Sequence, residues 1–147
     1  MSDDIDGFDR SVAARNHAVA IAERLAAFDR VVEVGVGRRT DVAARLADRA
    51  VAVTATDVHP RPVPDGVEFL RDDVTDPDPT VYEGADALYA LACPPELQRP
   101  VRDVARRHGA AFLFTTLGGD PAVVPARRER IPGGALFRAI QPGHSTR

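Results

Sequence analysis

The sequence has no lysine, few serines and one cysteine, and these absences exclude several kinds of enzyme. All 19 basic residues are arginine, so no side chain can form a Schiff base or complete the Gly-Lys-Ser/Thr sequence of a Walker-type phosphate loop. The three serines, Ser2, Ser11 and Ser145, lack the glycine-flanked setting of a nucleophile elbow, which argues against acyl transfer. Cys93 has no second cysteine with which to form an internal disulfide and fits a reducing compartment.

Long apolar runs are missing too. No stretch resembles a signal peptide or the roughly 20 apolar residues of a membrane span, so we expect a cytoplasmic protein without membrane contact. The four histidines lack the paired spacing of metal ligands, and no metal site is predicted. The length of 147 residues fits one domain. We expect a mobile N-terminus at 1–10, a single domain at 11–140 and a disordered tail at 141–147.

What the sequence does contain is a valine-rich run that leads into two glycines and then a helical pattern. Val31–Val34 precedes Gly35 and Gly37, and helix-compatible residues follow from Asp41 to Arg49. This succession is typical of the first strand, turn and helix of an α/β nucleotide-binding domain, where glycines without Cβ let a nucleotide approach the main chain. Thr40 is the expected N-cap of the helix.

An acidic residue lies at the distance that a nucleotide site requires. The dinucleotide fingerprint places a carboxylate about 20 residues beyond the turn, and Asp57 ends the next predicted strand. Its carboxylate is placed to accept both ribose hydroxyls. A nicotinamide nucleotide such as NAD is an alternative ligand, but Thr40 stands where Gly-x-Gly-x-x-Gly requires its third glycine.

The remaining pattern predicts alternating strands and helices. We predict a three-layer Rossmann-like α/β domain with a mostly parallel sheet of order 3-2-1-4-5 and one C-terminal edge strand. A first helix is expected from the N-cap Ser11 to about Phe28. The five parallel strands are expected at residues 30–34, 51–56, 67–70, 87–91 and 110–116. One helical turn is expected at 79–84, and a longer helix is expected to end near His108. A long loop is expected from Gly118, followed by the edge strand at 135–140.

The glycine turn resembles the first motif of S-adenosylmethionine-dependent methyltransferases, with Glu33, Gly35 and Gly37 in the matching places of Glu/Asp-x-Gly-x-Gly. The resemblance implies that Glu33 lies near the amino group of the cofactor; alternatively, its carboxylate accepts backbone N–H groups of the turn. It also implies that Asp73 binds the adenine amino group while the Val74 backbone meets the ring. An Asp-rich solvated turn is the competing interpretation of Asp73.

Two further segments complete the predicted site. Val58, after Asp57, is expected to pack against the adenine ring. The fourth predicted strand ends in Cys93-Pro94-Pro95-Glu96, where many methyltransferases acting on amino groups have a polar residue followed by Pro-Pro-aromatic. Glu96 and Tyr89 are the candidates for orienting a methyl acceptor. Pro94-Pro95 equally fits a rigid helix entry, because proline suits the first turn of a helix.

Taken together, these motifs are similar to a family of short archaeal Rossmann-like proteins catalogued as uncharacterised, and the similarity covers most of residues 10–140. Such proteins tend to have Ile-Arg before Pro-Pro, where this sequence has Ala92-Cys93. The resemblance implies a methyltransferase-like fold and a small-molecule nucleotide as ligand. It establishes no reaction.

Three functions remain open at this stage. The first is binding of S-adenosylmethionine with methyl transfer to an unknown acceptor; the second is binding of NAD; the third is a non-catalytic nucleotide sensor or interaction module. Residues 121–147 carry a net charge of +4 against −7 for the rest. Contact of Arg127, Arg128 and Arg130 with nucleic acid is therefore an alternative, but a solvated surface is the favoured interpretation. The sequence predicts no oligomeric state.

Overall fold

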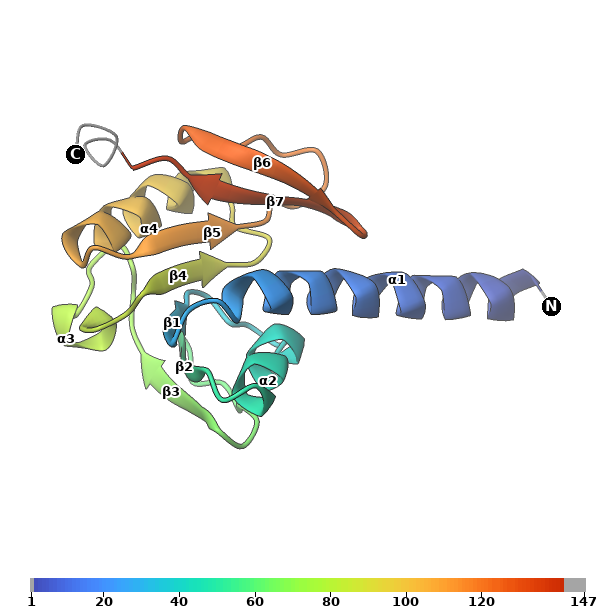
Figure 1. Ribbon diagram of the computed structural model, residues 1–147, viewed down its shortest axis with the longest axis horizontal. Coiled ribbons are helices and arrows are strands. Elements are labelled where there is room, and N and C mark those ends of the chain that lie inside the picture. The colour runs from blue at the N-terminus through green and yellow to red at the C-terminus, as the bar shows by residue number, and fades with distance from the viewer. Residues whose placement is uncertain (1, 142–147) are drawn as a thin grey trace.

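The computed structural model describes the backbone of residues 2–141 and the side chains of residues 11–141 (Figure 1). The helices are α1 (Ser2–Leu25), α2 (Asp41–Asp48), α3 (Pro79–Tyr82) and α4 (Pro95–Arg107). The strands are β1 (Arg30–Glu33), β2 (Ala52–Asp57), β3 (Val67–Arg71), β4 (Ala87–Ala90), β5 (Ala111–Phe114), β6 (Ala126–Ile131) and β7 (Gly134–Ala139).

All of these strands join one sheet, in the order β3-β2-β1-β4-β5-β7-β6. Neighbours from β3 through β5 run parallel, whereas β7 is antiparallel to both β5 and β6. The predicted order 3-2-1-4-5 is confirmed. The chain reverses its direction of progress between β1 and β4, and such switch points form the ligand crevice in open α/β sheets.

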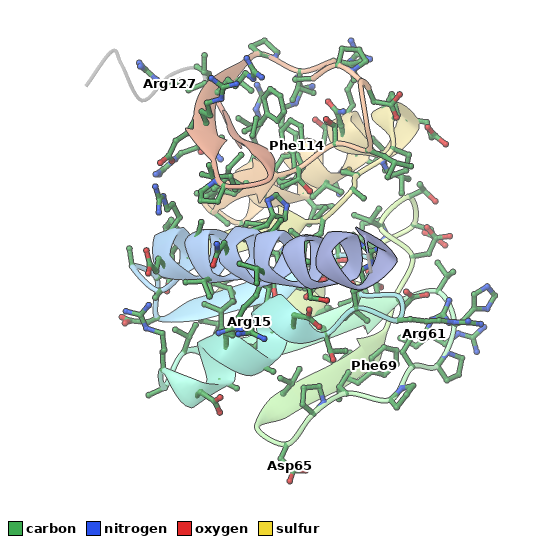
Figure 2. The ribbon with its side chains drawn as sticks, turned by 90° about the vertical axis from the view of Figure 1, so that its right-hand side faces the viewer. Arg15, Arg61, Asp65, Phe69, Phe114 and Arg127 are labelled. Carbon is green, nitrogen blue, oxygen red and sulfur yellow. The ribbon has the colours of Figure 1, made fainter. Side chains whose placement is uncertain are left out.

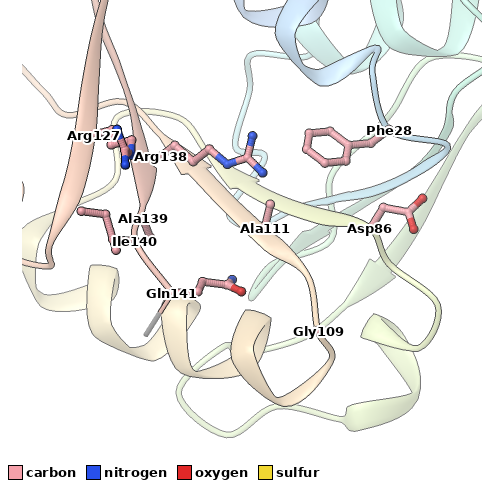
Figure 3. Close-up of a pocket in the computed structure, with 9 residues that line it drawn as sticks. All are labelled: Phe28, Asp86, Gly109, Ala111, Arg127, Arg138, Ala139, Ile140 and Gln141. Carbon is pink, nitrogen blue, oxygen red and sulfur yellow. The ribbon is translucent and has the colours of Figure 1, made fainter. Parts of the chain in front are cut away.

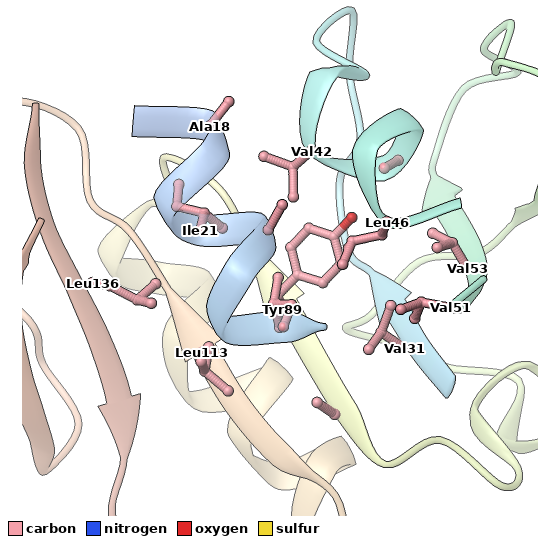
Figure 4. Packing of buried hydrophobic residues seen from close by; sticks show 14 of the residues in the cluster. Ala18, Ile21, Val31, Val42, Leu46, Val51, Val53, Tyr89, Leu113 and Leu136 are labelled. Carbon is pink, nitrogen blue, oxygen red and sulfur yellow. The ribbon is translucent and has the colours of Figure 1, made fainter. Parts of the chain in front are cut away.

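Helices cover both faces of the sheet, and the alternation of side chains along β1 shows the two cores directly. Val31 packs with α1 and α2, in a cluster that includes Ile21, Leu25 and Leu46 (Figure 4). Its neighbour Val32 points to the other face and packs in a second cluster, which includes Val101 and Val104 of α4. Successive residues of a strand face opposite sides, so a continuous apolar run is what a doubly covered strand requires. The predicted three layers are confirmed.

α1 differs from its prediction at both ends. It begins at Ser2, not at Ser11, and ends at Leu25, not at Phe28. Ala18, Ile21 and Leu25 of the predicted apolar stripe are buried, but the stripe marks only the half of the helix that packs on the sheet. In Figure 1 the N-terminal part projects past the sheet. No helix within residues 2–141 is long and apolar enough to cross a bilayer.

The C-terminal hairpin is the larger correction. Residues 126–131 form β6, the edge strand, in a segment predicted as loop, and the predicted edge strand near 135–140 is β7, which lies inside the sheet between β5 and β6. β6 escaped prediction because Arg127 through Arg130 are all charged and exposed, which hides any alternation of apolar and polar residues. Charged side chains are typical of edge strands, where they discourage pairing with another chain. Arg127, Arg128 and Arg130 of the basic segment therefore belong to the sheet.

Two contacts fasten this hairpin to α1. Nδ1 of His17 lies 2.8 Å from the carbonyl oxygen of Pro132 in the hairpin turn. Arg24 binds Glu129 through two nitrogens, with N–O distances of 2.9 and 2.5 Å. The hydrogen bond from Arg24 lowers the pKa of Glu129. These contacts hold β6 against the first helix although the two segments lie far apart in the sequence.

Gln98 of α4 fixes the loop that connects β5 to β6. Its side chain is fully buried; Nε2 donates to the carbonyl of Pro121 at 3.1 Å, and Oε1 accepts the N–H of Val123 at 2.6 Å. We predict that Gln98→Ala lowers the free energy of unfolding by about 1–3 kcal/mol, because it leaves two backbone groups unpaired. Arg99→Ala, which removes one exposed contact to the same loop, should change it by less than about 1 kcal/mol. Urea unfolding measures both, and equal effects would contradict the role of Gln98.

Candidate nucleotide-binding site

The glycine turn follows β1 directly. The N–H of Val36 donates to the carbonyl of Thr56 at 2.9 Å, so the turn stays joined to β2. Gly35 and Gly37 have φ angles of +72° and +57°, in the left-handed region that glycine tolerates best. A Cβ at Gly35 would meet no atom within 4 Å, and a Cβ at Gly37 would meet one only at 4.0 Å. The main chain therefore faces open space at the carboxyl end of the sheet.

Asp57, at the end of β2, lies against this turn. Its Oδ2 accepts the N–H of Gly37 at 2.9 Å, and its Oδ1 accepts the N–H of His59 at 3.0 Å. Partial burial raises the pKa of Asp57, but these backbone hydrogen bonds and the nearby charge of Arg61 outweigh it, and the net pKa is lowered. An ionised carboxylate thus supports the turn and retains lone pairs for further donors.

Arg61 is a neighbour that the sequence analysis missed. Its Nε lies 3.6 Å from Oδ2 of Asp57, and this buried nitrogen has no hydrogen-bond partner among the residues that the structure describes. With Gly37, Thr40 and the prolines of the loop after β2, Arg61 lines a pocket of about 500 Å³. Figure 2 shows Arg61 on this loop, on the other side of the molecule from Arg127. The sequence places Arg61 in a proline-rich loop without predicting its direction. Thr40 precedes α2 as predicted, but its side chain makes no capping hydrogen bond.

The predicted adenine-binding residues lie at the same end of the sheet. The N–H of Asp72 donates to the carbonyl of Asp57 at 3.1 Å, which ties the end of β3 to the end of β2. Val58 is 46% exposed and is one of the few exposed large hydrophobic residues in the described part of the chain, whereas Val74 is buried. Asp73 accepts the N–H and the hydroxyl of Thr75, at 2.9 and 2.6 Å, and these bonds lower the pKa of Asp73. Val58 follows the carboxyl end of β2 and Asp73 that of β3; contact of either residue with adenine stays a prediction.

Glu33 is the last residue of β1, just before the glycine turn, and its side chain points into the protein core. Its side chain is buried, and Oε1 accepts the hydroxyl of Tyr89 at 2.7 Å. Glu33 and Tyr89 are register partners on the neighbouring strands β1 and β4, so both point to the α1 face. Burial raises the pKa of Glu33 to about 8, and the Tyr89 hydrogen bond offsets only part of that rise. At neutral pH the folded protein therefore holds this carboxyl mainly in its protonated form.

The segment after β4 is shaped by Thr115, a second residue that the sequence analysis missed. Oγ1 of Thr115 accepts the N–H of Ala92 at 2.8 Å, and its carbonyl accepts the N–H of Cys93 at the same distance. Ala92 has a φ of +49°, an uncommon conformation for a residue with a Cβ. Thr115 therefore fixes the direction in which the chain leaves β4. No sequence pattern marks it, because its partners lie more than 20 residues away.

Of the two candidates for orienting an acceptor, only one is accessible. Glu96 is exposed in the first turn of α4, whereas Tyr89 is buried against Glu33. Pro95 opens the helix, which agrees with the interpretation of Pro94-Pro95 as a rigid helix entry. Burial, followed by the charge of Glu96, raises the pKa of the Cys93 thiol to about 12, so Cys93 is a protonated core residue. Within residues 11–141 no group of three His, Cys, Asp or Glu side chains is arranged to hold a metal ion.

Similarity to known sequences decides the family. Residues 15–141 match the family described as "Uncharacterised protein family (UPF0146)". The chain belongs to this family. A UPF0146 protein of Halobacterium salinarum is 62% identical over 120 residues, which cover 81% of this chain and 93% of that protein. A UPF0146 protein of Archaeoglobus fulgidus is 50% identical over 91 residues, covering 62% of this chain and 70% of that protein. The predicted resemblance to an archaeal family is confirmed.

Solved structures agree on the fold of this UPF0146 chain. The glycopeptide N-methyltransferase MtfA complexed with S-adenosyl-L-methionine has a TM-score of 0.54 at 16% identity, covering 85% of this chain and 65% of that one. The methyltransferase domain of bacterial CtHen1-C has a TM-score of 0.53 at 12% identity, covering 69% of this chain and 65% of that one. The fold is thus the α/β Rossmann-like methyltransferase fold. The chain spans less than two thirds of either structure.

Proposed function

We propose that this protein binds S-adenosylmethionine at the carboxyl end of β1 and β2 and transfers its methyl group to an acceptor. The observation that carries the proposal is the turn at Gly35 and Gly37, where left-handed glycines border open space and Asp57 lies directly behind the turn. The structural similarity to MtfA, which was solved with S-adenosyl-L-methionine, supports this choice of ligand. NAD is less favoured because Thr40 replaces the third fingerprint glycine.

Each residue has a defined part in this proposal. The Gly35–Gly37 backbone passes along the cofactor, Asp57 accepts the ribose hydroxyls, and Val58 with the Asp73–Val74 segment holds the adenine. Glu33 enters as a buried support beneath the turn, since its carboxyl is engaged by Tyr89. When bound, the cofactor supplies an activated methyl group: the acceptor's lone pair forms a bond to the methyl carbon, the carbon–sulfur bond breaks with its electron pair returning to sulfur, and the acceptor's proton passes to solvent. Alignment of the reactants then provides most of the acceleration.

The experiment is a calorimetric titration of the purified protein with S-adenosylmethionine, S-adenosylhomocysteine and NAD in separate runs. The proposal predicts saturable binding of the two adenosyl ligands, with NAD at least tenfold weaker. Tighter binding of NAD would reassign the crevice to a nicotinamide nucleotide. Binding of none of the three at millimolar concentration would leave the alternative of a non-catalytic interaction module, to be studied through its partners.

A matched pair of glycine variants separates loss of binding from loss of fold. Gly37→Ala places a Cβ where the cofactor would lie, while Gly109→Ala creates the same left-handed strain at the amino end of β5. Both should destabilise the fold by about 1 kcal/mol. We predict that only Gly37→Ala weakens binding of S-adenosylhomocysteine, by tenfold or more. Equal affinities of the two variants would show that the ligand does not touch the turn.

A further inference from the structure

A second cavity opens at the carboxyl end of β5, two strands from β1 in the sheet. Its volume is about 630 Å³, within the range of small-molecule sites. Thr115 after β5, His17 of α1 and the β6–β7 hairpin line it. The hydroxyl and backbone of Thr115 also hold Ala92 and Cys93 at the end of β4. The cavity therefore adjoins the segment before Glu96, the accessible candidate for orienting an acceptor.

The charge in this cavity is predominantly positive. Arg128 and Arg130 both line it, because alternate residues of β6 share a face. Glu129, between them, points to the other face and is engaged by Arg24. Among the side chains of residues 11–141, none forms an ion pair or hydrogen bond with Arg128 or Arg130. Asp120 is the one carboxylate of the lining, so two guanidinium groups face a single negative charge.

Two neighbouring groups add hydrogen-bonding capacity. Oγ1 of Thr115 accepts the Ala92 N–H, and within the described side chains nothing accepts the hydroxyl proton, which remains available to a ligand. His17 donates from Nδ1 to the carbonyl oxygen of Pro132, and its Nε2 is the second polar atom of the ring. The loop that supplies Asp120 is fixed by Gln98 through Pro121 and Val123. The cavity is therefore held in shape by buried contacts.

We propose that this cavity receives the methyl acceptor, and that the acceptor is a small molecule carrying a phosphate or carboxylate group held by Arg128 and Arg130. That the bound molecule is a methyl acceptor rests on the proposed function. Binding of an anion in this cavity is testable without the cofactor. Guanidinium groups bind such anions through paired N–H donors. Protection of an edge strand explains exposed arginines in general, but it does not require two of them to line a cavity with a free hydroxyl donor.

The hairpin offers a matched control on its opposite face. Arg127 and Arg138 are register partners and line a different pocket with Phe28 and Asp86 (Figure 3). In that view the guanidinium of Arg138 points toward Phe28, whose ring centroid lies 5.8 Å away. Replacing this pair by alanine removes the same charge from the same hairpin and leaves the proposed acceptor cavity intact.

The test is a titration with inorganic pyrophosphate at fixed ionic strength, without cofactor. We expect the double variant Arg128→Ala/Arg130→Ala to bind pyrophosphate at least tenfold more weakly than wild type, and Arg127→Ala/Arg138→Ala to change by less than threefold. Arg128→Lys/Arg130→Lys, which keeps the charge, should recover part of the affinity. Equal weakening in both alanine doubles would overturn the proposal, as would unchanged binding in all variants. Circular dichroism checks that each variant is folded.

Two further titrations test whether the anion belongs to a small molecule or to a nucleic acid, and whether the proposed function fails independently of the anion site. A 12-nucleotide single-stranded RNA that binds over a hundredfold tighter than pyrophosphate, with equal loss in both alanine doubles, would reassign the hairpin to nucleic acid and overturn the small-molecule acceptor. S-adenosylhomocysteine should bind the Arg128→Ala/Arg130→Ala variant as it binds wild type. If wild type binds pyrophosphate as expected but never binds S-adenosylhomocysteine, the proposed function fails and the acceptor assignment falls with it, while the anion site stands.

Discussion

The Asp57→Ala variant is expected to bind S-adenosylhomocysteine about tenfold to a hundredfold more weakly than wild type, a loss of roughly 1–3 kcal/mol. Two effects combine. The ribose hydroxyls lose an ionised acceptor, since the pKa of Asp57 is lowered, and the N–H of Gly37 loses the oxygen that fixes the turn. Asp57→Asn keeps one acceptor oxygen without the charge, so its affinity for S-adenosylhomocysteine should lie between those of wild type and Asp57→Ala.

Asp65 provides the control for this variant. It is exposed at the tip of the loop between β2 and β3 (Figure 2), and Asp65→Ala removes the same charge away from the glycine turn. We expect its affinity to match wild type within twofold when both are titrated by calorimetry. An Asp57→Ala protein that folds and retains wild-type affinity would remove Asp57 from the site.

The second large effect concerns stability. Burial raises the pKa of Glu33 from an ordinary 4.5 to about 8 in the folded protein. Between these values the folded state holds a proton that the unfolded chain has released, so the free energy of unfolding falls as the pH rises toward 8. At about 1.4 kcal/mol for each unit of pKa difference, the fall reaches the order of 3–5 kcal/mol. Glu33→Gln has no titrating group and still accepts the Tyr89 hydroxyl, so this part of the fall should vanish.

The measurement is urea unfolding of both proteins at pH 5 and pH 8, at one salt concentration. Glu33→Gln should gain stability relative to wild type on going from pH 5 to pH 8. Glu83→Gln removes an exposed carboxylate near α3 and should keep the wild-type pH dependence. If Glu33→Gln and wild type lose the same stability over this range, the buried carboxyl does not titrate as the structure implies.

The Glu33–Tyr89 contact also marks where sequence reasoning reaches its limit. Strand order was predictable, and so was the position of Asp57 at the edge of the sheet that carries the glycine turn, because parallel strands place their carboxyl ends at one edge. The partner of Glu33 was not, since it depends on the register of β1 against β4, which no local pattern specifies. A carboxylate two residues before a glycine turn suggested a ligand contact or a backbone contact, and the structure places a tyrosine hydroxyl there.

The hairpin shows a second limit. Arg127 through Arg130 read as a basic terminal segment, and only pairing with β7 makes them a strand. Arg128 and Arg130 line one cavity that Arg127 does not reach, because alternate residues of the paired strand share a face; Arg127 and Arg128 also border a smaller pocket near Phe28. Thr115 and Gln98 were missed for a related reason: each acts through backbone groups remote in sequence. Side chains that shape a site from a distance carry no motif.

The most direct measurement of the central claim is a titration of the isotopically labelled protein with S-adenosylhomocysteine, followed through its backbone amide resonances. Binding on the glycine turn predicts saturable shifts of the amides of Gly35, Gly37, Val58 and Val74, with one common dissociation constant. The amides of the β6–β7 hairpin should move little. Shifts confined to the hairpin, or no shifts at a millimolar concentration of the ligand, would contradict the account.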